Sequence, residues 1–445
     1  MRLTHALRLQ PGMSVAFVGA GGKSSALAVA ARELEGSCPV ILTTSTKIFD
    51  FQHTFARAHH QVSHAEQLQD LDEWLNEASS IMLTGTHSPE EPKWLGLSLP
   101  LLARVQAYAR EHDVVLAIEA DGARTLPLKA PAEHEPVIPQ GVDLVVALAG
   151  LDVLGHPLNA EHVHRSHLAA GLIDVEEGIS IEPDHVAALI RHPRGGMKGI
   201  PSQAEVRVFL NKAETQQRRR AARRIAAALQ AFEGVDAVLV GSLQNPDPIQ
   251  AVYARVAGMV LAAGGSRRLD QPKQLIEWKG HPLVWHAATA ALEGGLDPVV
   301  VVTGCEAARV RDAVADLPVE FVHNPDWEAG QSTSFKRGLA ATQARVNAVV
   351  AMLADMPFVD AAVVQSVLAR YRETMAPLVA PSVQGRRANP ALFDRVTFKD
   401  LAEIVGDRGG RVLFDRFDAA WVPWDERIRF DVDTPEDLEW LQTQT

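Results

Sequence analysis

The chain has 445 residues, a length too great for one ordinary hydrophobic core, so we expect two domains. Hydrophobic residues make up 47% of it and charged residues 22%, a mixture typical of folded globular proteins and not of disordered ones. The formal net charge of -12 argues against a nucleic-acid partner, because phosphate backbones are held mainly by excess Lys and Arg.

Cysteine content and the first residues bear on the cellular compartment. Only Cys38 and Cys305 are present, without the spacing of a zinc site, so we expect no disulfide framework, no structural metal and a reducing cytoplasm. The first apolar stretch is interrupted by Pro11 and runs into a glycine loop, unlike a signal peptide. No run approaches the ~18 apolar residues of a membrane span, so no membrane partner is expected.

Apolar runs alternate with Ala/Leu-rich stretches along the whole chain, which predicts an α/β fold with parallel sheets covered by helices. Strands are expected in the first half at 14–18, 40–44, 80–84, 114–118, 143–148, 206–210 and 236–240. The irregular region 151–199 is interpreted as a lid or insertion. The basic cluster at 218–224 is typical of a solvated helix face.

The first strand leads into GAGGKSSAL and then a helix, which resembles a P-loop. There, glycine amides and a helix N-terminus would cradle phosphates, Lys23 would bridge them and Ser24 would reach Mg²⁺. The strict GxxxxGK[ST] pattern is not met, because Phe17 stands where its first Gly belongs. The compact form is similar to the loops of Mur-ligase-like enzymes. The nucleotide-binding candidates are Gly19, Gly21, Gly22, Lys23 and Ser24, for ATP or GTP.

Two later elements of the first half support this nucleotide site. Glu119 and Asp121 follow an apolar strand and are suited to binding Mg²⁺ or orienting an attacking group. Asn211 and Lys212 follow another strand and resemble the base-reading NKxD loop of GTPases. Because Glu214 replaces the Asp of that motif, the choice of guanine stays open.

A turn-rich stretch, GSLQNPDPIQ, ends the first half, and we predict domains at 1–252 and 253–445. The second domain opens with the strand 256–262 and a glycine turn that lets the backbone approach a triphosphate, followed by the cations Arg267, Arg268 and Lys273. The nucleotide-binding candidates here are Leu261, Ala262, Ala263, Gly264 and Gly265.

Carboxylates from two distant stretches could bind Mg²⁺ beside this loop. Asp355 follows the apolar run 349–352, although it could also be a turn or capping residue before Pro357. Asp431 and Asp433 are expected at a strand end, where alternation would send both to one face and let them share a cation with Asp355. Their alternative role is helix capping, for which Thr434 is the better candidate.

The second half resembles the MobA-like nucleotidyltransferases, and within them the molybdenum cofactor cytidylyltransferases. The resemblance covers 256–445 and rests on LAAGGSRRLDQPKQLI, NPDWEAGQSTSFKRGL, LADMPFVD, NPALF, GDRGGR and FDVDTPEDL. It implies a Rossmann-like GT-A type fold in which Arg268 and Lys273 hold the triphosphate and Asp355, with Asp433 or Asp431, binds Mg²⁺. It also implies substrate contacts by Gln331, Ser332, Thr333, Ser334, Asn389, Pro390, Gly406 and Asp407.

The reaction implied by this resemblance is attack of a molybdenum-pterin phosphate on the α-phosphorus of CTP, giving the cytosine dinucleotide cofactor and pyrophosphate. The resemblance implies CTP as the nucleotide, because the loop of this chain reads LAAG and not LAGG. Asp270 departs from the family, which has Gly there, and leaves the loop's conformation in doubt. A guanylyl or sugar-phosphate transferase and a non-catalytic cofactor-insertion chaperone are the alternatives. Trp278, Trp285, Trp327, Trp421 and Trp424 are interpreted as core or interface residues.

The first half resembles the YqeC family, accessory proteins of selenium-dependent molybdenum hydroxylases. The resemblance covers 5–250 and rests on GAGGKSS, TTSTKIF, KWLG, EADGARTLPLKAPAEHEPVIP, GLDVLG and HVHR. It implies a molybdenum hydroxylase or other maturation factors as partners. Residues in the matching motifs that could contact phosphate or substrate are Thr43, Thr44, Lys47, Lys129 and Arg165. The sequence as a whole therefore predicts a P-loop-like parallel-sheet domain followed by a nucleotidyltransferase domain.

Overall fold

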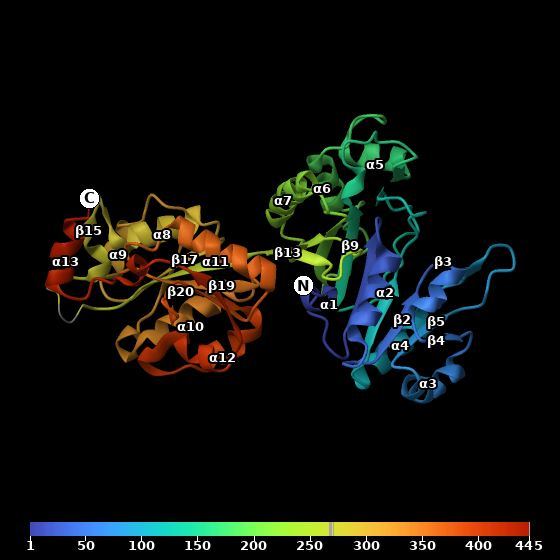
Figure 1. Ribbon diagram of the computed structural model, residues 1–445, viewed down its shortest axis with the longest axis horizontal. Helices are drawn as coiled ribbons and strands as arrows, with labels where there is room; N and C mark the ends of the chain where they lie inside the picture. The colour runs from blue at the N-terminus through green and yellow to red at the C-terminus, as the bar shows by residue number, and fades with distance from the viewer. Residues whose placement is uncertain (267–268, 270, 445) are drawn as a thin grey trace. The chain divides into compact units, whose positions relative to one another are not determined.

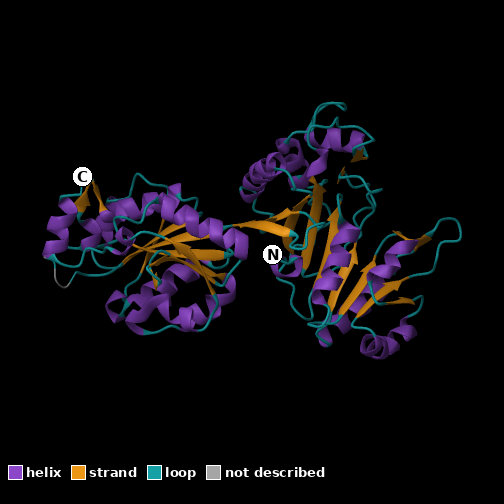
Figure 2. Ribbon diagram, in the orientation of Figure 1, coloured by secondary structure: helices purple, strands orange, loops and turns teal. Residues whose placement is uncertain are grey.

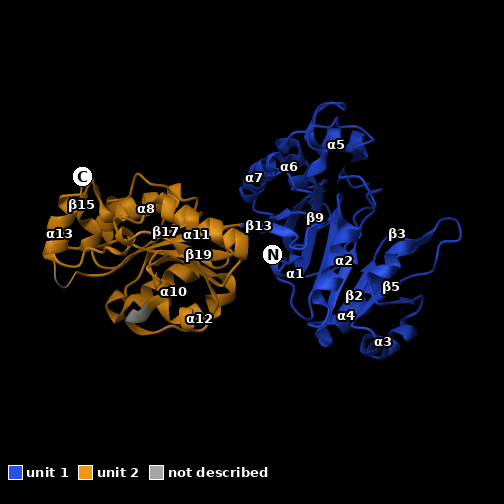
Figure 3. Ribbon diagram, viewed as in Figure 1, with its two compact units in different colours: residues 1–253 blue, residues 254–445 orange. Residues whose placement is uncertain are grey.

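The computed structural model describes residues 1–266, 269 and 271–444, without the side chains of residues 407 and 408. It divides into two compact units, Met1–Tyr253 and Ala254–Thr445 (Figure 3). Each unit is built on its own β-sheet, and the two are described separately below. Within the described residues, no helix combines the length and apolarity needed to cross a membrane.

The first unit is centred on a sheet with the strand order β13-β12-β11-β9-β1-β7-β2-β5-β4 (Figure 1). All pairings from β12 to β4 are parallel. The strands are β1 (Ser14–Gly19), β2 (Val40–Thr44), β4 (Ala58–Gln61), β5 (Ser80–Thr84), β7 (Val115–Glu119), β9 (Leu144–Gly150), β11 (Glu205–Asn211), β12 (Ala237–Gly241) and β13 (Ile249–Ala254). The predicted parallel α/β architecture of this unit is confirmed.

Helices cover this sheet, which is why its central strands are apolar throughout and do not alternate with polar residues. Helices α6 and α7 pack on β9, β11 and β12, with Ile225 and Leu229 of α7 fully buried. The helices are α1 (Leu3–Ala6), α2 (Lys23–Leu34), α3 (Leu71–Glu77), α4 (Leu99–Glu111), α5 (Ser166–Ile173), α6 (Pro183–Arg191) and α7 (Gln216–Gln230). Short pieces are η1 (Asp50–Phe55), η2 (Ala65–Asp70), η3 (Leu151–Val153) and the strand pairs β3 (Ile48–Phe49) with β6 (Lys93–Trp94) and β8 (Leu128–Lys129) with β10 (Val163–His164).

Region 151–199 is part of the core of the first unit, and the interpretation of it as a lid or insertion is wrong. Leu151, Val153 and Val163 are fully buried among the apolar side chains that α5 and α6 contribute. Many of the Gly, Pro and His residues of this region, such as Gly155, Gly178 and Pro193, lie in the turns between these elements and obscure its apolar periodicity. The basic cluster at 218–224 does form an exposed helix face on α7, as predicted.

The stretch expected to separate the domains is shorter than predicted. Its turn formers end at Pro248, and Ile249–Ala254 form β13, which adjoins β12 at the edge of the first sheet. Only Arg255 separates β13 from the first strand of the second unit. The chain therefore passes from one sheet to the next without a long linker.

The second unit has a mixed sheet with the order β18-β17-β14-β19-β22-β20-β21, to which β23 adds beside β20. Strands β18 to β19 are parallel, as the α/β pattern predicts, but β22 pairs antiparallel with both β19 and β20, which that pattern does not predict. The strands are β14 (Val256–Ala262), β17 (Val299–Thr303), β18 (Glu320–His323), β19 (Ala348–Leu353), β20 (Leu378–Val383), β21 (Arg386–Arg387), β22 (Ala391–Asp394) and β23 (Ala419–Pro423).

Helices lie on both faces of this mixed sheet (Figure 2). Val260 of β14 packs with α8 and α11 on one face, and Met259 packs with α10 and α12 on the other. The helices are α8 (Leu283–Glu293), α9 (Ala307–Asp312), α10 (Gln331–Thr342), α11 (Ala361–Thr374), α12 (Phe398–Glu403) and α13 (Pro435–Gln442). Short pieces are η4 (Lys273–Leu275), η5 (Trp327–Ala329), η6 (Arg395–Thr397), η7 (Gly406–Asp415), η8 (Glu426–Arg429), β15 (Glu277–Trp278) and β16 (His281–Pro282). The predicted Rossmann-like fold of this unit is confirmed.

Candidate functional site

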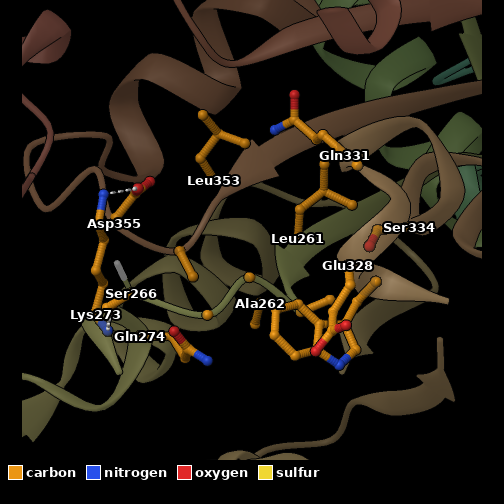
Figure 4. Close-up of a pocket in the computed structure, with 16 residues that line it drawn as sticks. Leu261, Ala262, Ser266, Lys273, Gln274, Glu328, Gln331, Ser334, Leu353 and Asp355 are labelled. Atoms are coloured by element: carbon orange, nitrogen blue, oxygen red, sulfur yellow. Dashed lines mark hydrogen bonds and ion pairs between the residues drawn. The ribbon is translucent and has the colours of Figure 1, made fainter. Parts of the chain in front are cut away.

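A cavity of about 310 Å³ opens in the second unit where β14 and β19 end (Figure 4). The two strands are parallel neighbours, so their carboxyl ends meet at one edge of the sheet, the usual ligand site of open α/β folds. The lining residues are Leu261, Ala262, Ala263, Gly264, Gly265, Ser266, Lys273, Gln274, Trp327, Glu328, Gly330, Gln331, Ser334, Leu353, Ala354 and Asp355. All five nucleotide-binding candidates of this loop are among them.

The two glycines of the loop have different surroundings. A side chain at Gly264 would meet no atom within 4 Å, so its backbone stands open to the cavity. A Cβ at Gly265 would lie 2.8 Å from the indole ring of Trp327, and one at Gly304 would also lie 2.8 Å from that residue. The ring of Trp327 therefore packs closely against glycine backbone and forms one wall of the cavity.

Lys273 joins three segments that are distant in the sequence. Its backbone N–H donates to Ser266 Oγ at 2.8 Å, which fixes the residue to the glycine loop. Its ammonium lies 3.7 Å from Asp355 Oδ2 and also bonds Asp433 Oδ1. Figure 4 shows the Lys273 and Asp355 side chains meeting at the edge of the cavity. One cation is thus held between two carboxylates beside the open glycine loop.

The carboxyl group of Asp355 has a perturbed pKa. Burial raises this pKa above its ordinary value, the positive charge of Lys273 opposes the rise, and the negative charge of Asp431 adds to it. The perturbation shows that Asp355 lies in a partly desolvated position where a nearby cation is stabilising. Perturbed carboxyl groups of this kind are common at functional sites.

The segment that carries Asp431 and Asp433 is not a strand end, so that expectation is wrong. Residues 430–433 have no regular secondary structure, and Thr434 caps α13, with its hydroxyl accepting the N–H of Asp437. Val432 between the two aspartates is fully buried, and its N–H donates to the carbonyl of Asp355 at 3.1 Å. This tether places Asp433 against Lys273, whereas Asp431 is exposed.

The arrangement of the carboxylates at this site bears on whether it could hold a divalent cation. Within the described residues, no group of three or more His, Cys, Asp or Glu side chains gathers in a metal-binding arrangement. Asp355 and Asp433 nevertheless converge on the Lys273 ammonium. Because Mg²⁺ bound with substrate phosphates usually takes only one or two protein carboxylates, this pair fits such an ion.

Only some of the predicted substrate-binding residues of the second unit line the cavity. Gln331 and Ser334 line the cavity, but Ser332 is buried, and the Thr333 hydroxyl is bonded to the carbonyls of Asp326 and Gly330. Asn389 lines an adjoining cavity of about 60 Å³, whereas Pro390 and Gly406 line neither. Arg268, Asp270 and the side chain of Asp407 lie outside the described residues.

Several lining residues, among them Trp327, Gln274 and Glu328, are not among those predicted from the sequence. Trp327 was interpreted as a core or interface residue, but it forms a cavity wall, which corrects that interpretation. Gln274 and Glu328 also line the cavity. The sequence did contain a signal for these positions. Gln274 directly follows Lys273, and Trp327 and Glu328 belong to the same NPDWEAGQ motif as Gln331.

The first unit has a larger cavity, of about 460 Å³, around its P-loop-like turn. Gly19 and Gly21 adopt positive φ angles, and a Cβ at Gly21 would lie 2.3 Å from the backbone nitrogen of Gly150. The N–H groups of Gly19 and Gly21 donate to Asp121 and to the carbonyl of Leu126. The groups left to face a phosphate are therefore those of Gly22 and the first turn of α2.

Lys23 belongs to a buried network of alternating charges. Its ammonium lies 3.1 Å from Asp121 Oδ1, and Lys129 lies 3.0 Å from Asp121 Oδ2 and 2.8 Å from Glu135 Oε2. Arg165 donates to the same Glu135 oxygen at 2.8 Å. Burial alone would raise the pKa of Glu135, but the bonds from Arg165 and Lys129 lower it to about 2. Asp121 is thus occupied by two ammonium groups and a backbone amide.

Ser24 is connected to a second carboxyl group. Its hydroxyl donates to Glu119 Oε2 at 3.0 Å, and the same oxygen accepts Gln52 Nε2 at 3.1 Å. Burial raises the pKa of Glu119, while the charge of Lys23 and the bond from Ser24 act against the rise. Glu119 and Ser24 are therefore side by side, as a shared cation would require, whereas Asp121 is engaged by lysines.

Asn211 and Lys212 lie on the other side of the P-loop-like turn. The Asn211 amide donates to the Gly21 carbonyl at 2.7 Å and accepts the N–H of Leu243 at 3.0 Å. Lys212 pairs with Asp152 at 2.6 Å. The Asn211 side chain thus holds the glycine turn against the loop after β12, and both residues line the cavity.

Comparison with known proteins assigns a family to each unit. Residues 15–167 match the model of the YqeC protein family, and residues 258–420 match that of the MobA-like NTP transferase domain. The YqeC protein of Escherichia coli (strain K12) is 30% identical over 236 residues, which cover 52% of this chain and 88% of that protein.

Two relatives match the second unit. The nicotine blue oxidoreductase of Paenarthrobacter nicotinovorans is 33% identical over 198 residues, 41% of this chain and 94% of that protein. A probable molybdenum cofactor guanylyltransferase of Opitutus terrae is 35% identical over 114 residues, 26% of this chain and 54% of that protein. The chain therefore belongs to the YqeC family through its first unit and to the MobA-like NTP transferases through its second.

Proposed function

We propose that the second unit transfers CMP from CTP to the phosphate of molybdenum-pterin, forming the cytosine dinucleotide cofactor and releasing pyrophosphate. The observation that carries this proposal is the position of Lys273 between Asp355 and Asp433 at the edge of an open glycine loop. A cation and two carboxylates around one cavity suit the binding of a nucleoside triphosphate with its divalent metal.

Asp355 and Asp433 would hold Mg²⁺, which supplies charge neutralisation for the triphosphate when it is bound. The open backbone at Gly264 allows phosphate oxygens to approach closely, and Lys273 offsets the charge that develops on the transferred phosphorus. The ring of Trp327 and the Gln331 and Ser334 side chains form the opposite wall, where they would orient the reacting partners.

The choice of CTP rests on the LAAG loop sequence, and a guanylyl transferase is the second candidate because one relative is a probable molybdenum cofactor guanylyltransferase. Incubation with molybdenum-pterin, Mg²⁺ and each nucleoside triphosphate in turn separates the two. We expect pyrophosphate release with CTP. Release with GTP alone would move the assignment to guanylyl transfer, and release with sugar phosphates but not with the pterin would remove the cofactor role.

We further propose that the first unit is an accessory nucleotide-binding unit for ATP or GTP, working with a molybdenum hydroxylase or its maturation factors in the cytoplasm. The support is the helix N-terminus after Gly22, with Lys23 and Ser24 lining a cavity of about 460 Å³. A non-catalytic insertion chaperone would retain its biological output after Asp355→Ala. The proposed transferase would lose that output.

A further inference from the structure

The cavity of the first unit extends to both sides of the P-loop-like turn. That turn follows β1, which lies between β9 and β7 in the sheet. One rim of the cavity follows β11 and β12, with Asn211 and Gln244, and the other follows β2, with Lys47 and Phe49. Five strand spacings separate β12 from β2, roughly 24 Å at the usual distance between strands, so the two rims follow strands that are far apart in the sheet.

The two rims differ in chemistry. The rim after β11 and β12 is polar except for the buried Leu243, and it is fixed to the glycine turn through Asn211. The rim after β2 is aromatic, and its residues Phe49 and Phe51 are 40% and 61% exposed. Their rings are stacked with centroids 6.0 Å apart. Two large apolar side chains thus stand open to solvent inside one cavity, where their rings offer a stacking surface to a ligand.

Cationic side chains line the cavity next to this aromatic rim. Lys93 lies across from Phe49 in the β3–β6 pair, with its ammonium 5.4 Å from the centre of the Phe49 ring. Lys47 and Lys93 share one carboxylate, that of Glu91, at 3.7 and 2.9 Å. The exposed Arg124 lines the same cavity. The charged side chains described in this part of the cavity lining, Lys47, Lys93 and Arg124, are therefore all cationic, although the carboxylates of Glu91 and Asp50 lie outside the lining next to them.

Hydrogen bonds connect this rim to the P-loop-like turn. Gln52 is buried, its side-chain oxygen accepts the N–H of Phe49 at 2.7 Å, and its nitrogen donates to Glu119 at 3.1 Å. Glu119 in turn accepts the hydroxyl of Ser24 at 3.0 Å. The aromatic segment is thus held in a defined position relative to the first turn of α2.

From these observations we infer that the cavity binds two ligands at once, an inference that rests on the proposed nucleotide site of this unit. A nucleotide with its phosphates at Lys23 can extend its base toward only one rim, and the polar rim, which carries the exposed amide of Gln244, suits a base. The rim of Phe49, Phe51 and Lys93 takes the second ligand, a planar aromatic molecule that carries a carboxylate or phosphate. Stacking and charge pairing are the interactions that these side chains offer.

The test uses the full chain and pterin-6-carboxylate, a planar fluorescent anion, as the probe. In the presence of saturating ATP or GTP with Mg²⁺, the probe is expected to bind one site per chain, and uncharged pterin is expected to bind more weakly. Phe51→Ala should weaken probe binding by at least fivefold, the lower end of the loss for an aromatic stacking contact. Lys93→Gln should weaken binding of the charged probe more than that of pterin.

Controls separate this inference from the proposed nucleotide site. Leu99→Ala removes an equally exposed apolar side chain outside the cavity and should leave probe binding unchanged. Phe51→Ala should leave nucleotide affinity and thermal stability unchanged. Displacement of the probe by nucleotide, or an equal loss of both affinities in Phe51→Ala, would mean that the aromatic rim holds the nucleotide base and would overturn the inference. If nucleotide binds but the probe does not, the inference of a second ligand is overturned and the proposed nucleotide site stands. If nucleotide does not bind, both are overturned.

Discussion

The two units place a lysine beside a glycine turn in opposite ways. Lys23 is 4% exposed and is enclosed by Asp121, with a second lysine and Glu135 behind it. The side chain of Lys273 is 22% exposed. The residue begins the short helix η4, and its ammonium contacts carboxylates from two segments that are distant in the sequence. A buried, fully paired lysine contributes to stability as well as binding, whereas a lysine at a cavity edge can be removed at little cost to folding.

The largest expected effect is on folding of the first unit. Lys23→Ala leaves the buried Asp121 without one of its two cations, and breaking a buried ion pair typically costs about 3–5 kcal/mol. We expect the calorimetric transition of the first unit to move to lower temperature, with the second transition unchanged. Arg223→Ala on the exposed face of α7 is the control. An unchanged first transition would mean that the Lys23 pair is not structurally important.

Lys273→Ala should instead affect turnover. Loss of a group that stabilises transition-state charge typically lowers kcat by about 100- to 1,000-fold. We expect this loss in pyrophosphate release with CTP, with thermal stability unchanged because the side chain lies at the cavity edge. Lys399→Ala, an exposed lysine of α12, should behave as the unmodified protein. A destabilised Lys273→Ala with normal kcat would reverse the comparison between the units.

Acid should selectively destabilise the first unit. The pKa of Glu135 is lowered from 4.5 to about 2 in the folded state, so its ionised form stabilises folding at pH values above about 4.5. This contribution, about 3 kcal/mol, is lost as pH falls from 4.5 toward 2. Unfolding followed across this range should show a slope that is reduced in Glu135→Gln and retained in Glu111→Gln, an exposed residue of α4.

The two aspartates near the C-terminal helix can be distinguished. Asp433 contacts Lys273, whereas Asp431 is exposed and acts on Asp355 only through its charge. We expect Asp433→Asn to reduce pyrophosphate release by about tenfold or more, the usual loss for an ion ligand or its partner. Asp431→Asn should change it much less. Equal losses would show that both carboxylates bind the cation.

The smallest effect concerns the two loop glycines. Gly265→Ala would place a methyl group 2.8 Å from the Trp327 ring, and overpacking of this kind costs about 1–3 kcal/mol. Gly264→Ala meets no neighbour and should leave stability unchanged while weakening nucleotide binding. Urea unfolding monitored by tryptophan fluorescence, together with nucleotide titration, measures both. Equal destabilisation by the two substitutions would contradict the difference in packing.

Much of the fold could be predicted because buried strands in α/β proteins are continuous apolar runs. The run at Val40–Thr44 is one example, and its predicted bounds match β2. The antiparallel insertion of β22 could not be predicted, because periodicity does not give strand direction. Region 151–199 was misread for a related reason, since its apolar residues are spread among turn formers and become a core only when α5 and α6 pack.

The candidate sites show the same limit at the level of side chains. The motifs gave the loop 261–265, Lys273 and Asp355, all of which line one cavity. They could not give the wall formed by Trp327, because its close packing on Gly265 and Gly304 brings together residues that are 62 and 23 positions apart in the sequence. The motifs also could not show that the backbone N–H groups of Gly19 and Gly21 donate to Asp121 and to the carbonyl of Leu126. These bonds depend on the folded conformation of the loop.

The hydrogen bond from Val432 to the carbonyl of Asp355 has a consequence for biosynthesis. The glycine loop, Lys273 and Asp355 are all translated well before residue 432, yet Asp433 reaches Lys273 only when Val432 is buried beside them. During synthesis the second unit can form most of its sheet while its carboxylate pair is still incomplete. In a nascent chain, this carboxylate pair would therefore be completed later than the glycine loop, Lys273 and Asp355, after much of the core that supports them has been made.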